Sequence, residues 1–363
     1  MLTKLQLTLP FFFLTLQLFG QTVQADSVAG LNISLNETSG IIYLQNKIIT
    51  HNDSGGQPVL YEIDTLTGSV ARQVVVSNAT NVDWEDICFD DSYIYIADIG
   101  NNLGNRTDLK VYKILISDYF NTPNDTVNAD VISFSYSNQI DFTLQQYSTN
   151  FDAEALISYD DSLYIFTKNW GNNKTNIYAL SKNVGSYSIS VIDSIDTQGL
   201  ISGAVYNEQA NQIVLVGYGY NSPFMVVINS VTSNVFSNAD VNKYNLLVSG
   251  SFQVESICNY NTSGYYITSE NYNTQPSVLS RLSTDGLMGV YSLPAIKSVY
   301  PNPFNEVLIL KQFNNSEISI YNSLGELVYS KHIQSDDFQI NTSHFLPGIY
   351  FLKTNSTTYK LIK

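Results

Sequence analysis

A short anchor recurs five times along this chain of 363 residues, and each copy opens a strand-like pattern. The anchor is a Ser or Glu, then a small or acidic residue, then an apolar residue. Its five copies are Ser39-Gly40-Ile41, Glu85-Asp86-Ile87, Glu154-Ala155-Leu156, Ser202-Gly203-Ala204 and Glu255-Ser256-Ile257. Successive copies start 46, 69, 48 and 53 residues apart. Intervals of this length are typical of four-stranded propeller blades, once an insertion at 121–149 is allowed for.

Further strand patterns follow every anchor, separated by turn residues such as Thr67-Gly68. Second strands are predicted at 47–50, 93–97, 163–167, 213–217 and 265–269, and third strands at 60–64, 109–114, 177–180, 225–228 and 279–282. An immunoglobulin-like sandwich also has short alternating strands, but it gives no reason for one anchor to recur at these intervals. We therefore expect an all-β fold with a β-propeller over 26–293. It would be five-bladed, or six-bladed if the 69-residue interval holds one more sheet.

Charge narrows the class of ligand. Asp and Glu total 32 against 17 Lys and Arg, a formal net charge of −15, so phosphate backbones and anionic lipids would be repelled. We expect no nucleic-acid partner and favour cations or neutral molecules as ligands.

The N-terminus has the pattern of an export signal. Lys4 precedes an apolar run from Leu5 to Phe19, and small residues follow. Residues 1–25 are predicted to be a signal peptide, cleaved either after Gly20 or after Ala25. A membrane anchor needs about 20 apolar residues, so the run is too short, and no integral membrane segment is expected elsewhere.

The two cysteines, Cys88 and Cys258, each follow an anchor Glu by three residues. They therefore occupy equivalent positions in the second and fifth repeats, which are not neighbours in a five-membered ring. A disulfide needs Cα atoms about 5.5–6 Å apart. Two buried thiols are predicted rather than a bridge.

The C-terminal segment differs in character from the repeats. It opens with Tyr300-Pro301-Asn302-Pro303, has a Leu-Gly turn within 318–328 and a Pro-Gly-Ile-Tyr motif within 346–353, and ends in the short basic stretch 359–363. Short alternating strands around tight turns predict a small β-sandwich at 299–363, after a linker at 294–298. This segment resembles the type A sorting domain of the type IX secretion system.

That resemblance implies a protein secreted to the extracellular space or the outer-membrane surface. It also implies handling by the type IX translocon, removal of the tag by a sortase-like peptidase, and release or attachment to surface lipopolysaccharide. The alternative is a carbohydrate-binding or fibronectin-like module that stays on the chain.

The anchors in the order Ser, Glu, Glu, Ser, Glu resemble the SdiA-regulated family of extracytoplasmic propellers over about 30–293. The segments Asp83–Ile87 and Asp98–Asn102 also resemble motifs of secreted propellers of unknown activity. That family has no settled reaction. The layout is also similar to gluconolactonase and phytase-like propellers, in which acidic residues around the central channel hold calcium. A likeness of fold alone is weak evidence for a function.

Propeller geometry brings the anchors and the ends of the second strands to one face, because the second strand runs antiparallel to the first. Acidic and amide oxygens gathered there suit Ca²⁺, which takes 6–8 oxygen ligands. The predicted metal ligands are Asp83, Glu85, Asp98, Asn101 and Glu154. In the alternative interpretation, the anchor Glu and Ser side chains hold neighbouring blades together by hydrogen bonds.

Predicted ligand contacts at the same face are Asp53, Trp84, Arg106, Asp152, Glu255 and Glu270. Arg106 could bind a carboxylate or phosphate, or pair with a loop Asp. Trp84 could stack on a sugar, or pack between blades. Glu85 and Glu154 are the candidate catalytic carboxylates.

Other chemistries are disfavoured. His51 is the only histidine of the predicted propeller, which excludes a His-rich zinc site, and there is no G-x-S-x-G, P-loop or G-x-G-x-x-G motif. We expect no nucleotide, flavin or haem. Three functions stay open: a propeller that binds a small molecule or saccharide through a calcium-holding face, a metal-dependent hydrolase of lactones, phosphoesters or glycosides, and a structural surface protein.

Overall fold

The structure is a computed structural model, and it describes residues 21–220, 222–232, 234–249, 253–270, 276–287, 298–311, 313, 316–335, 337–354 and 358–363. Residues 1–20 of the predicted signal peptide and 294–297 of the predicted linker lie outside the described residues.

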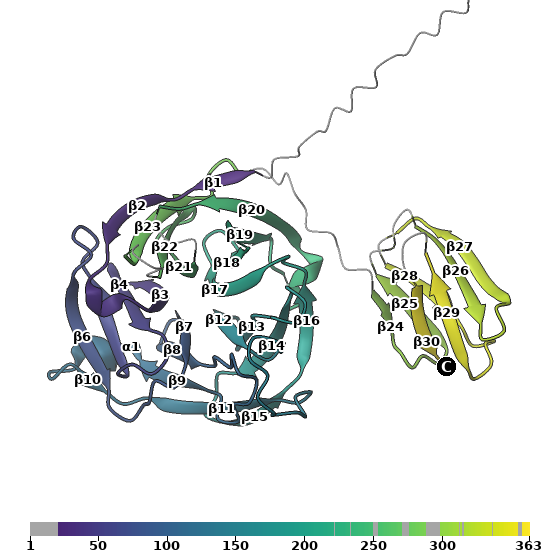
Figure 1. Cartoon of the computed structure of the whole chain (residues 1–363), viewed down its shortest axis with the longest axis horizontal. Helices are drawn as coiled ribbons and strands as arrows, with labels where there is room; N and C mark the ends of the chain where they lie inside the picture. Colours follow the sequence, from purple (N-terminus) through teal and green to yellow (C-terminus); the bar gives the residue numbers. More distant parts are fainter. Residues whose placement is uncertain are drawn as a thin grey trace, which may run out of the picture.

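The propeller predicted from the anchors is confirmed: the described residues form five sheets that stand around a common centre (Figure 1). From the inside outwards, the first sheet contains β3 (Thr38–Leu44), β4 (Lys47–Asn52), β5 (Val59–Ile63), β6 (Val70–Val76) and β10 (Thr126–Val127). The second contains β7 (Trp84–Phe89), β8 (Tyr93–Asp98), β9 (Lys110–Leu115), β11 (Asp130–Tyr136) and β15 (Gly185–Ile189). The third contains β12 (Ala153–Tyr159), β13 (Ser162–Thr167), β14 (Thr175–Ser181) and β16 (Val191–Ile195).

The two remaining sheets close the ring with strands from the start of the described chain. The fourth contains β17 (Leu200–Asn207), β18 (Gln212–Gly219), β19 (Ser222–Asn229), β20 (Asp240–Leu247) and β1 (Thr22–Gln24). The fifth contains β21 (Val254–Asn259), β22 (Gly264–Ser269), β23 (Val278–Ser283) and β2 (Asp26–Gly30). Short helical turns lie at α1 (Ile116–Asn121), η1 (Ile33–Leu35) and η2 (Phe236–Asn238).

The innermost strands pack on one another in a closed circle, β3 on β7, β7 on β12, β12 on β17, β17 on β21 and β21 on β3. A separate apolar cluster fills each of the five gaps between neighbouring sheets. Adjacent residues such as Ile41 and Ile42 belong to different clusters, because successive side chains of a strand point to opposite faces. Each sheet is therefore apolar on both faces.

The 69-residue interval between the second and third anchors forms no sheet of its own. Its strand β10 pairs in parallel with β6 of the first sheet, and β11 extends the second sheet beside β9. The residues from Ser137 to Asp152 make a long loop before β12. The insertion therefore supplies outer strands and this loop, which we call the insertion loop.

Both cysteines are free and buried, which confirms the prediction. Cys88 packs between the second and third sheets, and Cys258 packs between the fifth and first. Val23 of β1 is also buried, in the core between the fourth and fifth sheets.

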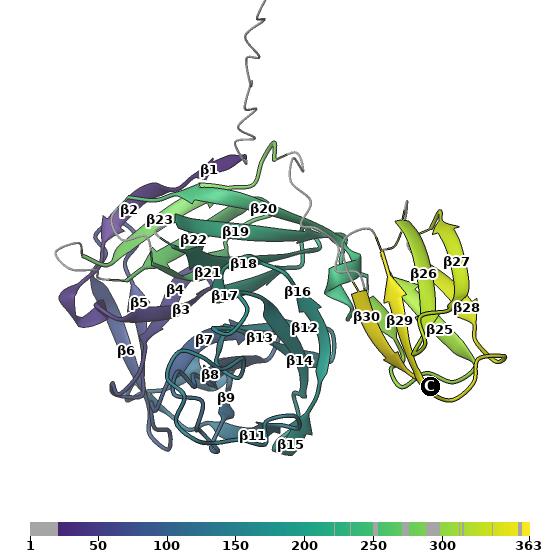
Figure 2. The same ribbon diagram turned by 45° about the vertical axis from the view of Figure 1, so that its right-hand side comes forward.

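The C-terminal segment forms two small sheets around a core of its own. One contains β24 (Ser298–Tyr300), β25 (Val307–Lys311) and β28 (Asp337–Asn341). The other contains β27 (Leu327–Ile333), β26 (Ser316–Asn322), β29 (Ile349–Lys353) and β30 (Thr358–Ile362) (Figure 2). Among the described residues, none of the helices has both the length and the apolar character needed to cross a membrane.

Candidate metal and ligand site

The recurring anchor is a β-bulge in each innermost strand. The Cα register with the second strand skips Glu85, Glu154, Ser202 and Glu255, and in the first sheet it skips Ser39 together with the next residue. A bulge leaves a residue unpaired and re-aims its side chain. The repeat seen in the sequence is thus a backbone device that frees one side chain per sheet at the same end of the ring.

The two Ser anchors follow the structural alternative. Ser39 Oγ donates a hydrogen bond to the carbonyl of Glu85 at 2.5 Å, and Ser202 Oγ donates to the carbonyl of Val254 at the same distance. Each bond joins one innermost strand to the next. The serines therefore hold neighbouring sheets together.

Carboxylates from three loops and two anchors converge at this end of the ring. Asp53, Asp83 and Glu85 have oxygens within 4.8 Å of one another, and so do Glu85, Asp152 and Glu154. Glu85 belongs to both triplets. We call these five residues the acidic cluster.

The acidic cluster is deeply buried at its centre. Glu85 is 3% exposed, Asp152 0% and Glu154 5%. Buried carboxylates are costly unless they are paired, and Glu85 Oε1 has no hydrogen-bond partner among the described residues. A purely oxygen donor set with an unsatisfied oxygen suits a hard divalent cation such as Ca²⁺.

Lys168 is bonded directly to the acidic cluster. Its Nζ lies 2.5 Å from Glu154 Oε2, with both side chains about 95% buried. The ammonium also lies 5.0 Å from the centroid of the Tyr218 ring. One lysine cannot balance five carboxylates, so the site favours a further cation or retained protons.

Burial and mutual repulsion raise the pKa values of the acidic groups. Burial raises the pKa of Asp53 to about 6 and that of Asp83 to about 7, with the neighbouring carboxylates adding to the effect on Asp83. Burial likewise raises the pKa of Glu255 to about 7, and burial with the charge of Glu255 raises that of Glu270 to about 9. Burial, followed by the charges of Asp53 and Glu154, raises the pKa of Glu85 well above its ordinary value. A bound cation would therefore have to displace protons.

Asp98 and Asn101 stand behind the acidic cluster. Asp98 Oδ1 accepts the backbone N–H of Asp83 at 3.1 Å and pairs with Arg106 at 2.8 Å. The Asn101 backbone N–H donates to Asp152 Oδ1 at 2.6 Å, while its side chain donates to the Phe151 carbonyl and accepts from the Arg106 backbone. Both predicted ligands thus position cluster residues through their own hydrogen bonds.

Arg106 and Trp84 match the structural alternatives given for them. Arg106 is bound by Asp98 and by Asp108 at 3.1 Å. Trp84 is 0% exposed, donates its indole N–H to the carbonyl of Thr80 at 3.0 Å, and packs between the first and second sheets. Glu255 and Glu270 lie beside the acidic cluster, where the charge of Asp53 acts on both.

Gly100 allows the acidic cluster to pack tightly. A Cβ built there would overlap Glu85 Oε1 and Asp83 Oδ2. The carbonyl of Gly100 accepts a bond from Arg106 at 2.8 Å, which holds the backbone in place. A larger residue here would require the Glu85 and Asp83 side chains to move.

Sequence reasoning missed Lys168, Tyr218 and Trp170. A signal for the first two exists: Lys168 directly follows its second strand, as Asp53 and Glu270 follow theirs. The register pairs Thr38 with Asn52, Ala153 with Thr167 and Val254 with Ser269, which makes the next residues equivalent. Selecting only acidic residues at this position left out the lysine and the tyrosine.

Asp86 is a buried carboxylate that links three innermost strands. Its carboxylate accepts the backbone N–H of Ile87 and of Leu156 at 2.8 Å, and of Ala204 at 3.4 Å. These bonds link β7, β12 and β17. The pKa of Asp86 is raised well above its ordinary value by burial.

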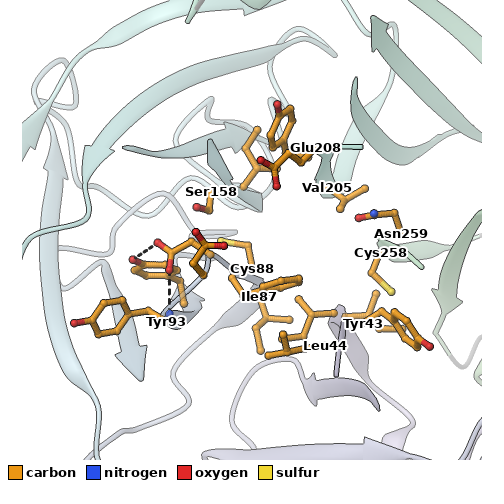
Figure 3. A pocket seen from close by; sticks show the side chains of 18 of the residues that line it. Tyr43, Leu44, Ile87, Cys88, Tyr93, Ser158, Val205, Glu208, Cys258 and Asn259 are labelled. Carbon is orange, nitrogen blue, oxygen red and sulfur yellow. Dashed lines mark hydrogen bonds between the residues drawn. The ribbon is translucent and has the colours of Figure 1, made fainter. Parts of the chain in front are cut away.

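A cavity of about 900 Å³ lies at the opposite ends of the innermost strands. Tyr43 and Tyr93 stand on its wall, Ile87 and Cys88 line it from β7, and Cys258 lies across from them (Figure 3). None of the predicted ligand-binding residues lies in this cavity.

Comparison with solved structures gives only weak likenesses. An aldose sugar dehydrogenase from Streptomyces coelicolor in its PQQ-bound form is 11% identical over 71% of this chain and 96% of its own, with a TM-score of 0.40. An exo-β-1,3-galactanase from Phanerochaete chrysosporium is 10% identical over 87% of this chain and 93% of its own, with a TM-score of 0.44. PorZ, a surface component of the type IX secretion system of Porphyromonas gingivalis, is 11% identical over 90% of this chain and 44% of its own, at 0.34. Scores this low support no inference about function, and among curated proteins none matches this chain.

The closed ring of sheets and the separate C-terminal sandwich define a β-propeller protein with an appended small β domain. Residues 298–363 match the model of the secretion system C-terminal sorting domain, beginning one residue before the predicted boundary. The chain is thus a β-propeller protein sorted by the type IX system to the cell surface or the extracellular space.

Proposed function

We propose that the propeller binds a ligand through a Ca²⁺ ion held by the acidic cluster. The observation that carries this proposal is the shared position of Glu85. It contributes to both carboxylate triplets, is 3% exposed, and keeps one oxygen without a hydrogen-bond partner.

Calcium is favoured over other cations by the donor set. The acidic cluster offers only carboxylate oxygens, which hard cations prefer. Mg²⁺ demands near-ideal octahedral geometry and keeps several waters, whereas Ca²⁺ accepts many oxygens in irregular arrangements. Asp53 and Asp83 are partly exposed, so the cation would keep an open side for a ligand.

The test is calorimetry with CaCl₂ on the mature full-length chain, with melting temperature as a second readout. The variant Glu85→Gln removes the shared charge, and Glu208→Gln makes the same change at an exposed position on the opposite end of the ring. We expect Glu85→Gln to weaken binding by at least about tenfold, because a carboxylate ligand carries much of the affinity for Ca²⁺, and Glu208→Gln to bind as the wild type does. No heat and no rise in melting temperature in the wild type would leave the structural surface protein as the better interpretation.

Hydrolysis by the same carboxylates is the second candidate. The closely spaced Glu85 and Glu154 both have raised pKa values because of burial, so either carboxyl group can hold the proton that a general acid donates. Lactonase, phosphoesterase and glycosidase assays on wild type, Glu85→Gln and Glu154→Gln address it. Equal inactivity of all three proteins would exclude catalysis of these reactions by these residues.

The sorting domain supports three further proposals: recognition by the translocon, cleavage by a sortase-like peptidase, and release or attachment to lipopolysaccharide. Intact-mass measurement of the exported protein tests cleavage, because removal of residues 298–363 and any added glycolipid both change the mass. The signal peptide at 1–25 and the resemblance to SdiA-regulated propellers remain predictions.

A further inference from the structure

An aromatic pair stands at the edge of the acidic cluster. The Trp170 indole N–H donates to Asp152 Oδ2 at 2.7 Å, so the ring is fixed against a cluster carboxylate. The ring of Tyr147 lies 4.8 Å from that of Trp170, centroid to centroid, with 55° between the planes. Tyr147 is 51% exposed, so this pair offers an open aromatic surface beside the site.

The insertion loop is built to place Tyr147 there. The Tyr147 backbone N–H donates to the carbonyl of Asn102 at 2.9 Å, and that of Gln145 donates to Leu103 at 2.8 Å. Trp170 is tied to the same loop, because its backbone N–H donates to Thr149 at 3.2 Å. Tyr147 has a φ of 51°, a left-handed conformation that is unusual for an aromatic residue. The loop thus accepts local strain to hold this ring in position.

The insertion loop also exposes other apolar side chains. Ile140 is 92% exposed, Leu144 64% and Phe142 40%, and Leu103 of the neighbouring loop is 39% exposed. Exposed apolar groups that gather beside a polar site are a common mark of a binding surface.

These features narrow the ligand class. The acidic cluster repels anions, and Lys168 already lies 5.1 Å from the centroid of the Trp170 ring, which disfavours a second organic cation there. A neutral sugar combines hydroxyl oxygens, which can complete the coordination of Ca²⁺, with an apolar C–H face that packs on aromatic rings. From this combination, and resting on the proposed calcium site, we propose that Tyr147 and Trp170 form a stacking platform for a neutral saccharide whose hydroxyls bind the cation.

The experiment titrates the mature full-length chain, with and without CaCl₂, with neutral hexasaccharides of glucose, xylose and mannose. Calorimetry is one readout and tryptophan fluorescence is the other. The chain has two tryptophans, and Trp84 is fully buried, so a change in emission on binding reports on Trp170.

Tyr147→Ala is the main variant, because its side chain is half exposed and its loss should leave the fold intact. The matched control is Tyr206→Ala, which removes one ring of the Tyr159–Tyr206 pair, also 4.8 Å apart, at the other end of the ring. We expect at least one oligosaccharide to bind only with calcium present. Tyr147→Ala should weaken that binding about tenfold, in the range of one stacking contact, while Tyr206→Ala leaves it unchanged.

Calcium affinity measured without sugar separates the two proposals. If Tyr147→Ala and wild type bind Ca²⁺ equally but no oligosaccharide binds, the platform proposal is wrong and the calcium site stands. Failure of Ca²⁺ itself to bind removes both. Choline chloride is the remaining probe: if it binds at the site and competes with Ca²⁺, the ligand is an organic cation and the saccharide is excluded.

Discussion

The raised pKa of Asp83 makes a testable statement about the stability of the metal-free protein. The ordinary pKa of an Asp side chain is 3.8, and that of Asp83 is raised to about 7 in the folded protein by burial and then by the charge of Asp53. Between these two values the folded state keeps a proton that the unfolded state has lost. Stability must therefore fall as pH rises through this window, with the full effect reached above pH 7.

The magnitude follows from the two pKa values. The complete difference is worth about 4 kcal/mol at 1.36 kcal/mol per pKa unit. Over the accessible range from pH 5 to pH 8, linkage predicts a loss of about 3 kcal/mol from Asp83 alone. For a domain of this size, that loss lowers the melting temperature by roughly 6–10 °C.

Other groups titrate in the same range, so a matched variant is needed. Burial lowers the pKa of His51 to about 4, and that group acts in the opposite direction, stabilising the fold as pH rises towards 6.5. Asp83→Asn keeps His51 and the remaining carboxylates but removes the titration of Asp83. The difference between wild type and variant therefore reports on Asp83 together with its effect on Glu85, whose pKa the Asp83 charge raises.

The assay is scanning calorimetry in EDTA at pH 5 and pH 8, repeated with calcium at pH 8. Wild type should lose about 3 kcal/mol more than Asp83→Asn between the two pH values, and calcium should raise the melting temperature of wild type more than that of the variant. The same pH dependence in both proteins would refute the buried, repelled environment assigned to Asp83. An equal response of both to calcium would remove Asp83 from the cation site.

Three further predictions follow from individual contacts. Gly100→Ala should weaken calcium binding measured by calorimetry, because the new Cβ displaces the carboxylates of Glu85 and Asp83. Overpacking should also cost about 1–3 kcal/mol of stability. Unchanged calcium affinity would show that these oxygens can move apart freely. Lys168→Met should destabilise the metal-free protein at pH 7 by about 3–5 kcal/mol in denaturant titrations, because it leaves the buried Glu154 without its partner. The loss of stability should be smaller at pH 5 than at pH 7. A loss of stability that does not depend on pH would contradict the ion pair. The exported chain should begin at Gln21 rather than Asp26, since β1 pairs with β20 and Ala25 is 0% exposed. Intact-mass measurement distinguishes the two start points. A measured mass that corresponds to a chain starting at Asp26 would show that β1 is dispensable.

Much of the propeller could be predicted because its repeat is a backbone requirement. Every innermost strand needs a bulge at the same height, and the bulge leaves a readable anchor in the sequence. The third residue of the anchor is apolar because it returns to the core between sheets, as Ile87 does. The outer strands were harder to predict, since β10 and β15 pair with sheets other than those of their neighbours in sequence.

The acidic site was predicted from residue type and from the face of the ring on which the residues lie. These two criteria also explain which residues the prediction missed. Asp53, Asp83, Glu85, Asp152 and Glu154 meet because strand direction decides which ends converge. Direction alone does not say which side chain turns inwards. Asp98 and Asn101 bond to Asp83 and Asp152 of the acidic cluster, and their role as metal ligands stays a prediction. Lys168 was missed because only acidic residues were selected at the position after the second strand, and Trp170 because its bond to Asp152 joins residues 18 apart in the sequence.

The N-terminal strands set the order in which this protein can assemble. β1 and β2 occupy the outer edges of the fourth and fifth sheets, although more than 200 residues separate Thr22 from its partner Asn245. A contact between such distant parts of a chain carries a large entropic penalty and forms late. The ring of sheets therefore stays open until almost all strands of the propeller are present to pair. Closure of the ring therefore joins the first two strands of the propeller to its last two sheets.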